Sequence, residues 1–168
     1  SVNSATSALH LCCLSLGVQK NDIVWTVPNS FVASANCALY CDAKVDFVDI
    51  DQETRNISLN LLEEKLLNSQ KNNKLPKVVI PVHFSGNPVN IEQLSKILKK
   101  FGDIKIIEDA SHALGATSSG HKVGSCQFSD LTVFSFHPVK MITTAEGGMI
   151  TTNNSYLAEK IMMLRSHG

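Results

Sequence analysis

The sequence predicts an α/β fold in which a mainly parallel sheet carries helices on both faces. Short apolar segments alternate along the chain with segments whose apolar residues recur at helical spacing. Most of the short segments are separated by roughly ten or more residues, the length of a helical crossover between parallel strands. Polar residues that could do chemistry follow the apolar segments, and ligands bind at that edge of such sheets.

The helices are expected from the spacing of their apolar residues. The first opens on serine and threonine and stops before Gly17, a residue that suits a helix end. The fourth has Ile91, Leu94 and Leu98 on one face. We expect helices at residues 4–16, 31–40, 60–68, 90–101 and 155–165.

The expected strands are short and rich in apolar residues, which is typical of strands buried on both faces. We expect them at residues 23–27, 44–50, 77–83, 104–108, 131–136 and 148–152. The last two lie too close together for a helical crossover. One of them is therefore expected to run antiparallel or to lie apart from its neighbour.

Composition indicates one ordinary globular domain. The chain has 168 residues, of which 43% are hydrophobic and 18% charged, with fifteen basic and fifteen acidic side chains. A formal net charge of zero argues against nucleic-acid binding, and no apolar run approaches the roughly 18 to 20 residues of a membrane span. The five cysteines are odd in number and form no CxxC pair, so we expect a reduced, cytoplasmic protein with buried thiols and no metal site.

The two ends of the sequence suggest a piece of something longer. It starts on Ser1 without an initiating methionine, and its first residues already look like the middle of a motif. It stops equally abruptly at Gly168. We therefore expect residues 1–168 to be an internal part of a longer protein.

The first candidate site is the start of the first expected helix, at residues 3–8. Its hydroxyl groups and free backbone N–H groups could bind an anion such as a phosphate, helped by the positive end of the helix dipole. The alternative is ordinary N-capping by Ser4 or Thr6.

The second candidate follows the expected strand at 104–108. That strand runs into Asp109, and His112 comes three positions later. A carboxylate at a strand end points into the crevice, where Asp109 could keep a cationic ring nitrogen protonated. The alternative is that Asp109 only caps the next turn.

The third candidate is Lys140, which follows the buried strand at 131–136. Its neighbours Met141 and Ile142 are apolar, so its amine could be partly desolvated and act as a nucleophile. The alternative is a solvated surface charge. Ser135, five residues upstream, could bind the same phosphate as the first helix.

The fourth candidate is Phe31, at an expected strand-to-helix turn. Its ring could stack on a planar heterocycle, or it could pack in the core. A weaker candidate is His83, which closes an expected strand beside Gly86 and could line the same site.

Taken together, these features are what pyridoxal phosphate (PLP) needs: a phosphate-binding helix start, an aromatic ring, a strand-end aspartate and a later lysine. In this order the chain resembles the DegT/DnrJ/StrS family of sugar aminotransferases, which have the aspartate-aminotransferase fold, also called fold type I. The resemblance covers nearly the whole chain. Its most specific stretches are residues 4–11, 108–115, 135–140 and 143–148.

The resemblance implies catalytic roles for three residues. Lys140 would hold PLP covalently and move the proton between the amino donor and the cofactor. Asp109 would pair with the ring nitrogen, and His112 would contact the ring or its 3-oxygen. A dehydratase branch of the family has histidine at the lysine position, so Lys140 favours transamination.

The resemblance also implies cofactor-binding roles. Thr6 and Ser7 would bind the phosphate, mainly through backbone amides, and Ser135 would add a hydroxyl. Phe31 would stack on the ring. These roles join Asp109, His112 and Lys140 in one predicted PLP site.

The architecture and the substrates follow from the same resemblance. Residues 1–168 would be part of the PLP-binding large domain, with a seven-stranded type of sheet, and would lack an N-terminal segment and a small C-terminal domain. The reaction would move an amino group, usually from glutamate, to C4 of a UDP-4-keto-6-deoxy-N-acetylhexosamine on the pseudaminic acid route. The working enzyme would be a homodimer whose sites are completed by the second subunit.

Two other interpretations are weighed against this one. A noncatalytic small-molecule-binding or regulatory homologue would keep the fold without the chemistry, and Lys140 argues against it. A Rossmann nucleotide-binding domain is disfavoured because no GxGxxG follows a strand, and the glycines between residues 115 and 124 have the wrong spacing.

Overall fold

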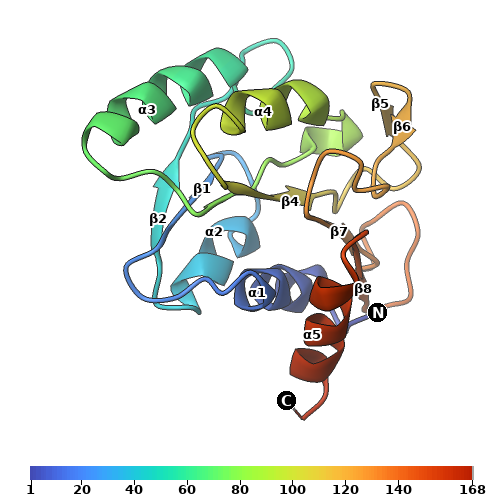
Figure 1. The fold of residues 1–168 in the computed structure, drawn as a ribbon. Coiled ribbons are helices and arrows are strands. Elements are labelled where there is room, and N and C mark those ends of the chain that lie inside the picture. Colours follow the sequence, from blue (N-terminus) through green and yellow to red (C-terminus); the bar gives the residue numbers. More distant parts are fainter. Residues whose placement is uncertain (168) are drawn as a thin grey trace.

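The computed structural model describes residues 1–167, which fold around one sheet of six strands. The strand order is β2-β1-β3-β4-β7-β8 (Figure 1). The strands are β1 (Ile23–Thr26), β2 (Lys44–Phe47), β3 (Val78–Val79), β4 (Lys105–Asp109), β7 (Leu131–Ser135) and β8 (Gly148–Thr151). The sheet of the described residues thus has one strand fewer than the seven-stranded type that we expected.

All neighbouring strands are parallel except the last pair. β1 pairs in parallel with β2 and β3, and the parallel pairing continues through β4 to β7. β8 runs antiparallel to β7, with Ser135 opposite Gly148. Because the connection between these two strands is short, we expected either an antiparallel pair or two strands that lie apart. The structure shows the antiparallel pair.

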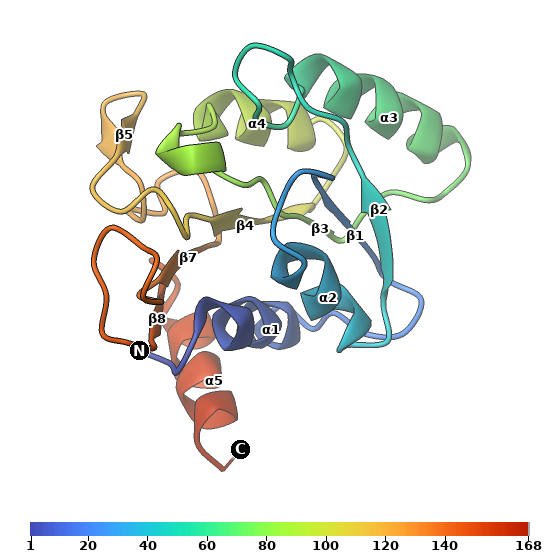
Figure 2. The ribbon, with the colours of Figure 1, turned by 180° about the vertical axis from the view of Figure 1, so that it is seen from behind.

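Helices cover both faces of the sheet, as the crossovers predicted. The helices α1 (Ala5–Ser15), α2 (Ala33–Leu39) and α5 (Ser155–Arg165) lie on one face. The helices α3 (Leu59–Lys71) and α4 (Ile91–Leu98) lie on the other, as the two opposite views show (Figures 1 and 2). No helix among the described residues is long and apolar enough to cross a membrane.

Two hydrophobic clusters hold these layers to the sheet. On the α1–α2 side, Leu9 and Cys12 pack with Ile107, whereas on the α3–α4 side, Leu66 and Leu94 pack in the cluster that contains Ile106. Ile106 and Ile107 are consecutive in β4, so successive side chains of this strand enter opposite clusters. The same alternation sends Glu108 and Asp109 to opposite faces, which matters below.

The largest departure from expectation is β3. A strand was expected over residues 77–83, but the regular strand is only Val78–Val79. Proline has no N–H group to donate, and Pro81 follows two residues later. Pairing with β4 returns as a single parallel bridge between Val82 and Asp109. Residues 81–83 therefore run beside the end of β4 as an extended segment.

Two small elements were not expected from the sequence. A hairpin joins β5 (Thr117–Ser118) and β6 (His121–Lys122). A short 3-10 turn, η1 (Phe84–Gly86), follows the extended segment, and Ser85 adopts a left-handed backbone conformation there. The two strands of the hairpin and the 3-10 turn are each only two or three residues long, which is too short for a periodic pattern to indicate them.

Candidate functional site

A cavity of about 440 Å³ opens at the edge of the sheet where β4 and β7 end, a size typical of small-molecule sites. Helix α1, the segment before α2, residues 82–84 and the loop after β7 form the rest of its wall. Six of the seven predicted site residues line it: Thr6, Phe31, Asp109, His112, Ser135 and Lys140. They come together because strand ends and helix starts meet at the same edge of a parallel sheet.

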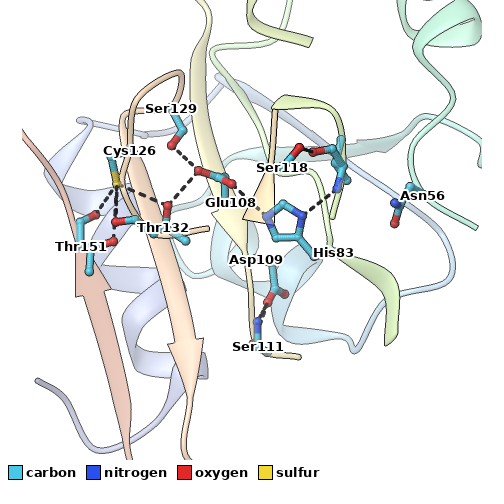
Figure 3. A network of polar contacts seen from close by, with 12 residues as sticks. Asn56, His83, Glu108, Asp109, Ser111, Ser118, Cys126, Ser129, Thr132 and Thr151 are labelled. Atoms are coloured by element: carbon cyan, nitrogen blue, oxygen red, sulfur yellow. Dashed lines mark hydrogen bonds and ion pairs between the residues drawn. The ribbon is translucent and has the colours of Figure 1, made fainter. Parts of the chain in front are cut away.

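Asp109 is the last residue of β4 and is almost completely buried. Its Oδ2 accepts a hydrogen bond from Ser34 Oγ at 2.6 Å. Its Oδ1 accepts from the Ser111 hydroxyl at 2.6 Å and from the Ser111 N–H at 3.1 Å (Figure 3). The capping role that we considered as the alternative is therefore present. A carboxylate has about four acceptor sites, so one remains for a donor in the cavity.

Lys140 and His112 contact each other in the cavity. Lys140 Nζ lies 2.5 Å from His112 Nε2, across 28 positions of sequence. Burial, followed by the positive charge of Lys140, lowers the pKa of His112 against an opposing effect of Asp109. A neutral imidazole can accept a hydrogen bond from an ammonium group. His112 can therefore orient the lysine amine by accepting its hydrogen bond.

The surroundings of Lys140 differ from the expectation. We expected its apolar neighbours to desolvate the amine, but Val139, Met141 and Ile142 are 77%, 63% and 59% exposed. Lys140 itself is half-buried. The loop turns its apolar side chains outward and its lysine inward. Val139, Met141 and Ile142 therefore do not shield the Lys140 amine from water.

Phe31 precedes α2 and lines the cavity with 73% of its surface exposed. Core packing, the alternative that we left open, is therefore wrong. An exposed ring at a cavity edge offers a flat face for a planar ligand.

Thr6 and Ser7, the two residues at the start of α1 that we expected to bind phosphate, do not line the same cavity. Thr6 lines the cavity, whereas Ser7 lines a separate hollow beside His10 and Arg165. The Ser7 N–H donates to Ser4 Oγ at 3.1 Å, so Ser4 is the N-cap and the Ser7 amide is already occupied. The structure does not bring Ser7 into the cavity with the other predicted residues.

Ser135 ends β7 and is 9% exposed. Its Oγ accepts a hydrogen bond from His137 N at 3.4 Å, which fixes the start of the loop that leads to Lys140. The same loop is closed by Lys140 N–H, which donates to the His137 carbonyl at 2.9 Å.

Several residues in or next to the cavity wall were missed. Ser34, in α2, holds Asp109 from 75 positions away, so only the packing of α2 against β4 reveals it. Ser111 is two residues after Asp109, and this spacing is a recognisable turn signal. Glu146 also lines the cavity, with its Oε1 3.9 Å from His137 Nε2.

The cysteines form a buried set without disulfides. All five are free thiols: Cys12, Cys13, Cys37, Cys41 and Cys126. Burial, and then the nearby Cys37 and Asp42, raise the pKa of Cys41. Over residues 1–167, no group of three or more His, Cys, Asp or Glu side chains is arranged to hold a metal ion.

A parallel α/β sheet that places a lysine amine, a buried aspartate and an exposed aromatic ring around one cavity is typical of enzymes that use PLP. This chain belongs to the DegT/DnrJ/EryC1/StrS aminotransferase family, whose model matches residues 1–168. The predicted family is confirmed.

The chain is similar to named relatives in sequence and to solved structures in fold. A UDP-4-amino-4,6-dideoxy-N-acetyl-beta-L-altrosamine transaminase of Campylobacter jejuni is 49% identical over 167 residues, which are 99% of this chain and 42% of that protein. The Helicobacter pylori aminotransferase PseC, involved in the biosynthesis of pseudoaminic acid, is 39% identical with a TM-score of 0.86, covering 99% of this chain and 43% of that one.

A third relative was solved in a PLP form. This Streptococcus pneumoniae protein, assigned as a sugar aminotransferase, is 31% identical with a TM-score of 0.84, covering 99% of this chain and 46% of that one. These likenesses confirm the predicted aminotransferase fold. The chain spans less than half the length of the relatives it matches.

Proposed function

We propose that the protein containing this chain is a PLP-dependent aminotransferase that transfers an amino group to C4 of a UDP-4-keto-6-deoxy-N-acetylhexosamine. The observation that carries this proposal is that Asp109, at the end of β4, and Lys140, in the loop after the neighbouring strand β7, line the same cavity. The names of the Campylobacter and Helicobacter relatives support the class of sugar.

The donor set of the cavity fits PLP in charge and in shape. At the start of α1, the N–H groups of Ala5 and Thr6 have no backbone acceptor within residues 1–167, which suits a phosphate. The remaining acceptor site of Asp109 suits a protonated ring nitrogen. Phe31 offers a face for the ring.

We propose that the cofactor is held by the residues that share this cavity: Thr6, Phe31, Asp109, His112, Ser135 and Lys140. Ser7 is left out because its amide is bonded to Ser4. When bound, PLP supplies an electron sink for the charge that develops as the amino donor loses its alpha proton.

The chain's own residues then have distinct tasks. The Lys140 amine binds the cofactor and, when released from it, moves the alpha proton without water. His112 Nε2 orients that amine and accepts its hydrogen bond. Asp109 places a negative charge where the ring nitrogen needs a positive one, and Ser34 and Ser111 hold the carboxylate in place.

We also propose glutamate as the amino donor and a homodimer as the working form, as the family resemblance implies. The exposed Val139, Met141 and Ile142 beside Lys140 support a site that another part of the protein covers.

The direct test is an assay of the complete gene product loaded with PLP. With glutamate and the UDP-4-keto sugar, mass spectrometry should detect an amino sugar and an equal amount of 2-oxoglutarate. A panel of other nucleotide-linked 4-keto sugars and other amino donors tests the finer assignment. A folded, PLP-bound protein that makes no product with any pair would favour the noncatalytic alternative and reject the proposal.

A further inference from the structure

A buried polar network lies on the face of β4 opposite to Asp109 (Figure 3). Its centre is a hydrogen bond between His83 and Glu108, with Nε2 and Oε2 2.9 Å apart. Both residues are at most 5% exposed. His83 also lines the cavity, as we expected from the sequence, but neither residue has a role in the chemistry proposed above. Buried polar pairs are costly unless their hydrogen bonds are satisfied, so this pair needs an explanation.

The hydrogen bonds of His83 fix its tautomer. The Val89 N–H donates to His83 Nδ1 at 2.9 Å, so that nitrogen carries no proton. The ring proton is therefore on Nε2, which donates to Glu108. His83 is held at both ends, by the backbone before α4 and by the side chain of β4.

Glu108 is equally well satisfied. Its Oε1 accepts hydrogen bonds from Ser129 and Thr132, the latter at 2.9 Å. Burial alone would raise the pKa of Glu108, but the bonds from His83, Ser129 and Thr132 outweigh it and hold the pKa below its ordinary value. Glu108 is thus a fixed anion that anchors β4 on this face.

The network is connected to the site through the backbone of Asp109. Asp109 N–H donates to the Pro81 carbonyl at 2.9 Å, and His83 N–H donates to the Asp109 carbonyl at 3.0 Å. On its other side, Asp109 lies opposite Val133 in the regular ladder to β7. On the β3 side the regular ladder stops at Val79, so the segment 81–83 alone holds the end of β4 there.

We infer that His83 and Glu108 are positioning residues for Asp109, setting where its carboxylate stands in the cavity. His83 bonds through its backbone to Asp109 and through its side chain to the residue before Asp109. It therefore ties the extended segment to the end of β4 at two points. This inference rests on the proposed function, because Asp109 matters only if it meets the cofactor's ring nitrogen.

The test uses the complete gene product and pyridoxamine 5′-phosphate, which binds without a covalent bond to lysine, with affinity measured by calorimetry. His83→Asn keeps an acceptor near Val89 but loses the donor to Glu108, and we expect roughly tenfold weaker binding, as for other residues that orient a ligand-binding group. His83→Gln places a donor near Glu108 again and should recover most of the affinity.

A matched control is Asn56→Ala. Asn56 is also buried and holds the same turn, through Phe84 N–H at 3.0 Å and the Asn87 carbonyl at 3.1 Å, and within residues 1–167 its side chain makes no hydrogen bond to β4. The Asn56→Ala substitution should lower the melting temperature without weakening the binding of pyridoxamine 5′-phosphate. Equal weakening by Asn56→Ala and His83→Asn would overturn the inference.

A double-mutant cycle separates positioning from general stability. In an Asp109→Asn background, His83→Asn should cause little further loss of affinity, because the group that it positions is already gone. The same tenfold loss in both backgrounds would overturn the inference. If His83→Asn does not fold, Glu108→Gln takes its place in the cycle, with the same two outcomes.

The two proposals fail in different ways. A folded wild-type protein that binds neither PLP nor pyridoxamine 5′-phosphate would reject the proposed function and this inference with it. If the wild-type protein binds pyridoxamine 5′-phosphate but the effects of His83→Asn and Asp109→Asn on affinity are additive, the inference is rejected and the proposed function is not.

Discussion

Glu108 and Asp109 are neighbours in sequence, yet they end on opposite faces of β4 in different environments. The Glu108 carboxylate is enclosed by donors from three side chains, His83, Ser129 and Thr132. Within residues 1–167, the Asp109 carboxylate also accepts three hydrogen bonds, from Ser34 and from the hydroxyl and N–H groups of Ser111, but it lines the cavity, which Glu108 does not. One carboxylate is thus closed off from the cavity and the other is open to a ligand there.

This difference gives two neighbouring residues of one strand different roles: Glu108 holds the fold, and Asp109 is available for chemistry. A buried, hydrogen-bonded carboxylate that does not face the cavity can hold the backbone but does not meet a ligand there. A carboxylate with a free acceptor site, on a rigid strand end, is prepared for a cationic partner. The two residues can therefore be told apart by what their substitutions do to binding, activity and stability.

The largest effect is expected on the open side of the strand, at Lys140. Lys140→Ala removes the amine that binds the cofactor and moves the proton, so turnover by the complete gene product should fall roughly 10³-fold or more. Pyridoxamine 5′-phosphate should still bind. The matched control is Lys122→Ala in the β5–β6 hairpin, which should leave turnover unchanged. Near-normal rates for Lys140→Ala would remove its assigned role.

Asp109→Asn should have the next largest effect. The amide keeps the shape of the side chain but not its charge, so the ring nitrogen loses its partner and turnover should fall roughly 100-fold. Stability should change little in comparison, and single-turnover kinetics would place the loss in the proton-transfer step. If Glu108→Gln slowed that step as much as Asp109→Asn does, the distinction between the open and closed carboxylates would be lost.

Ser34→Ala tests how the open carboxylate is held. It removes the donor to Asp109 Oδ2, and a hydrogen bond to a charged group contributes about 1.5–3 kcal/mol. We expect about a tenfold loss in kcat/KM. The control is Ser30→Ala, because Ser30 Oγ lies 2.8 Å from Ser34 Oγ and does not reach Asp109. A larger loss for Ser30→Ala than for Ser34→Ala would contradict this assignment.

The smallest predicted effect is the change that Glu108→Gln causes in the pH dependence of stability. The pKa of Glu108 lies below its ordinary value of 4.5 in the folded chain. Such a group stabilises the fold above the pKa of the unfolded chain, and this stabilisation is lost as the pH falls through the folded pKa. The variant should be less stable than wild type at pH 7, and the difference should shrink below about pH 4.5.

Urea unfolding of the complete gene product at a series of pH values measures that difference. Glu64→Gln, on the exposed face of α3, serves as the control and should follow wild type. A stability difference for Glu108→Gln that stays constant from pH 7 to pH 4 would contradict the lowered pKa.

Much of the fold was predictable because its elements are periodic and long enough to show a pattern. All five helices and all six strands of the sheet were expected, with the bounds of α5 matching residues 155–165. β3 was overestimated because its apolar run continues past Pro81, which ends the regular ladder. The β5–β6 hairpin was missed because strands of two residues carry no alternation.

The candidate site was predictable only in part, because local sequence shows where a side chain starts and not what meets it. Asp109 and Lys140 follow recognisable strands, but the contact between Lys140 and His112 spans 28 positions. Ser34 is invisible until α2 is packed. The outward turn of Met141 and Ile142 could not be inferred, since their apolarity suggested burial.

The central claim is that Lys140 is the residue to which the cofactor binds. It is tested most directly by loading the complete gene product with PLP, reducing it with borohydride and mapping the peptides by mass spectrometry. We expect a pyridoxyl group on the peptide that contains Lys140 and none on other lysines. A folded protein that carries the group elsewhere, or that takes up none, would show that Lys140 is not the residue to which the cofactor binds.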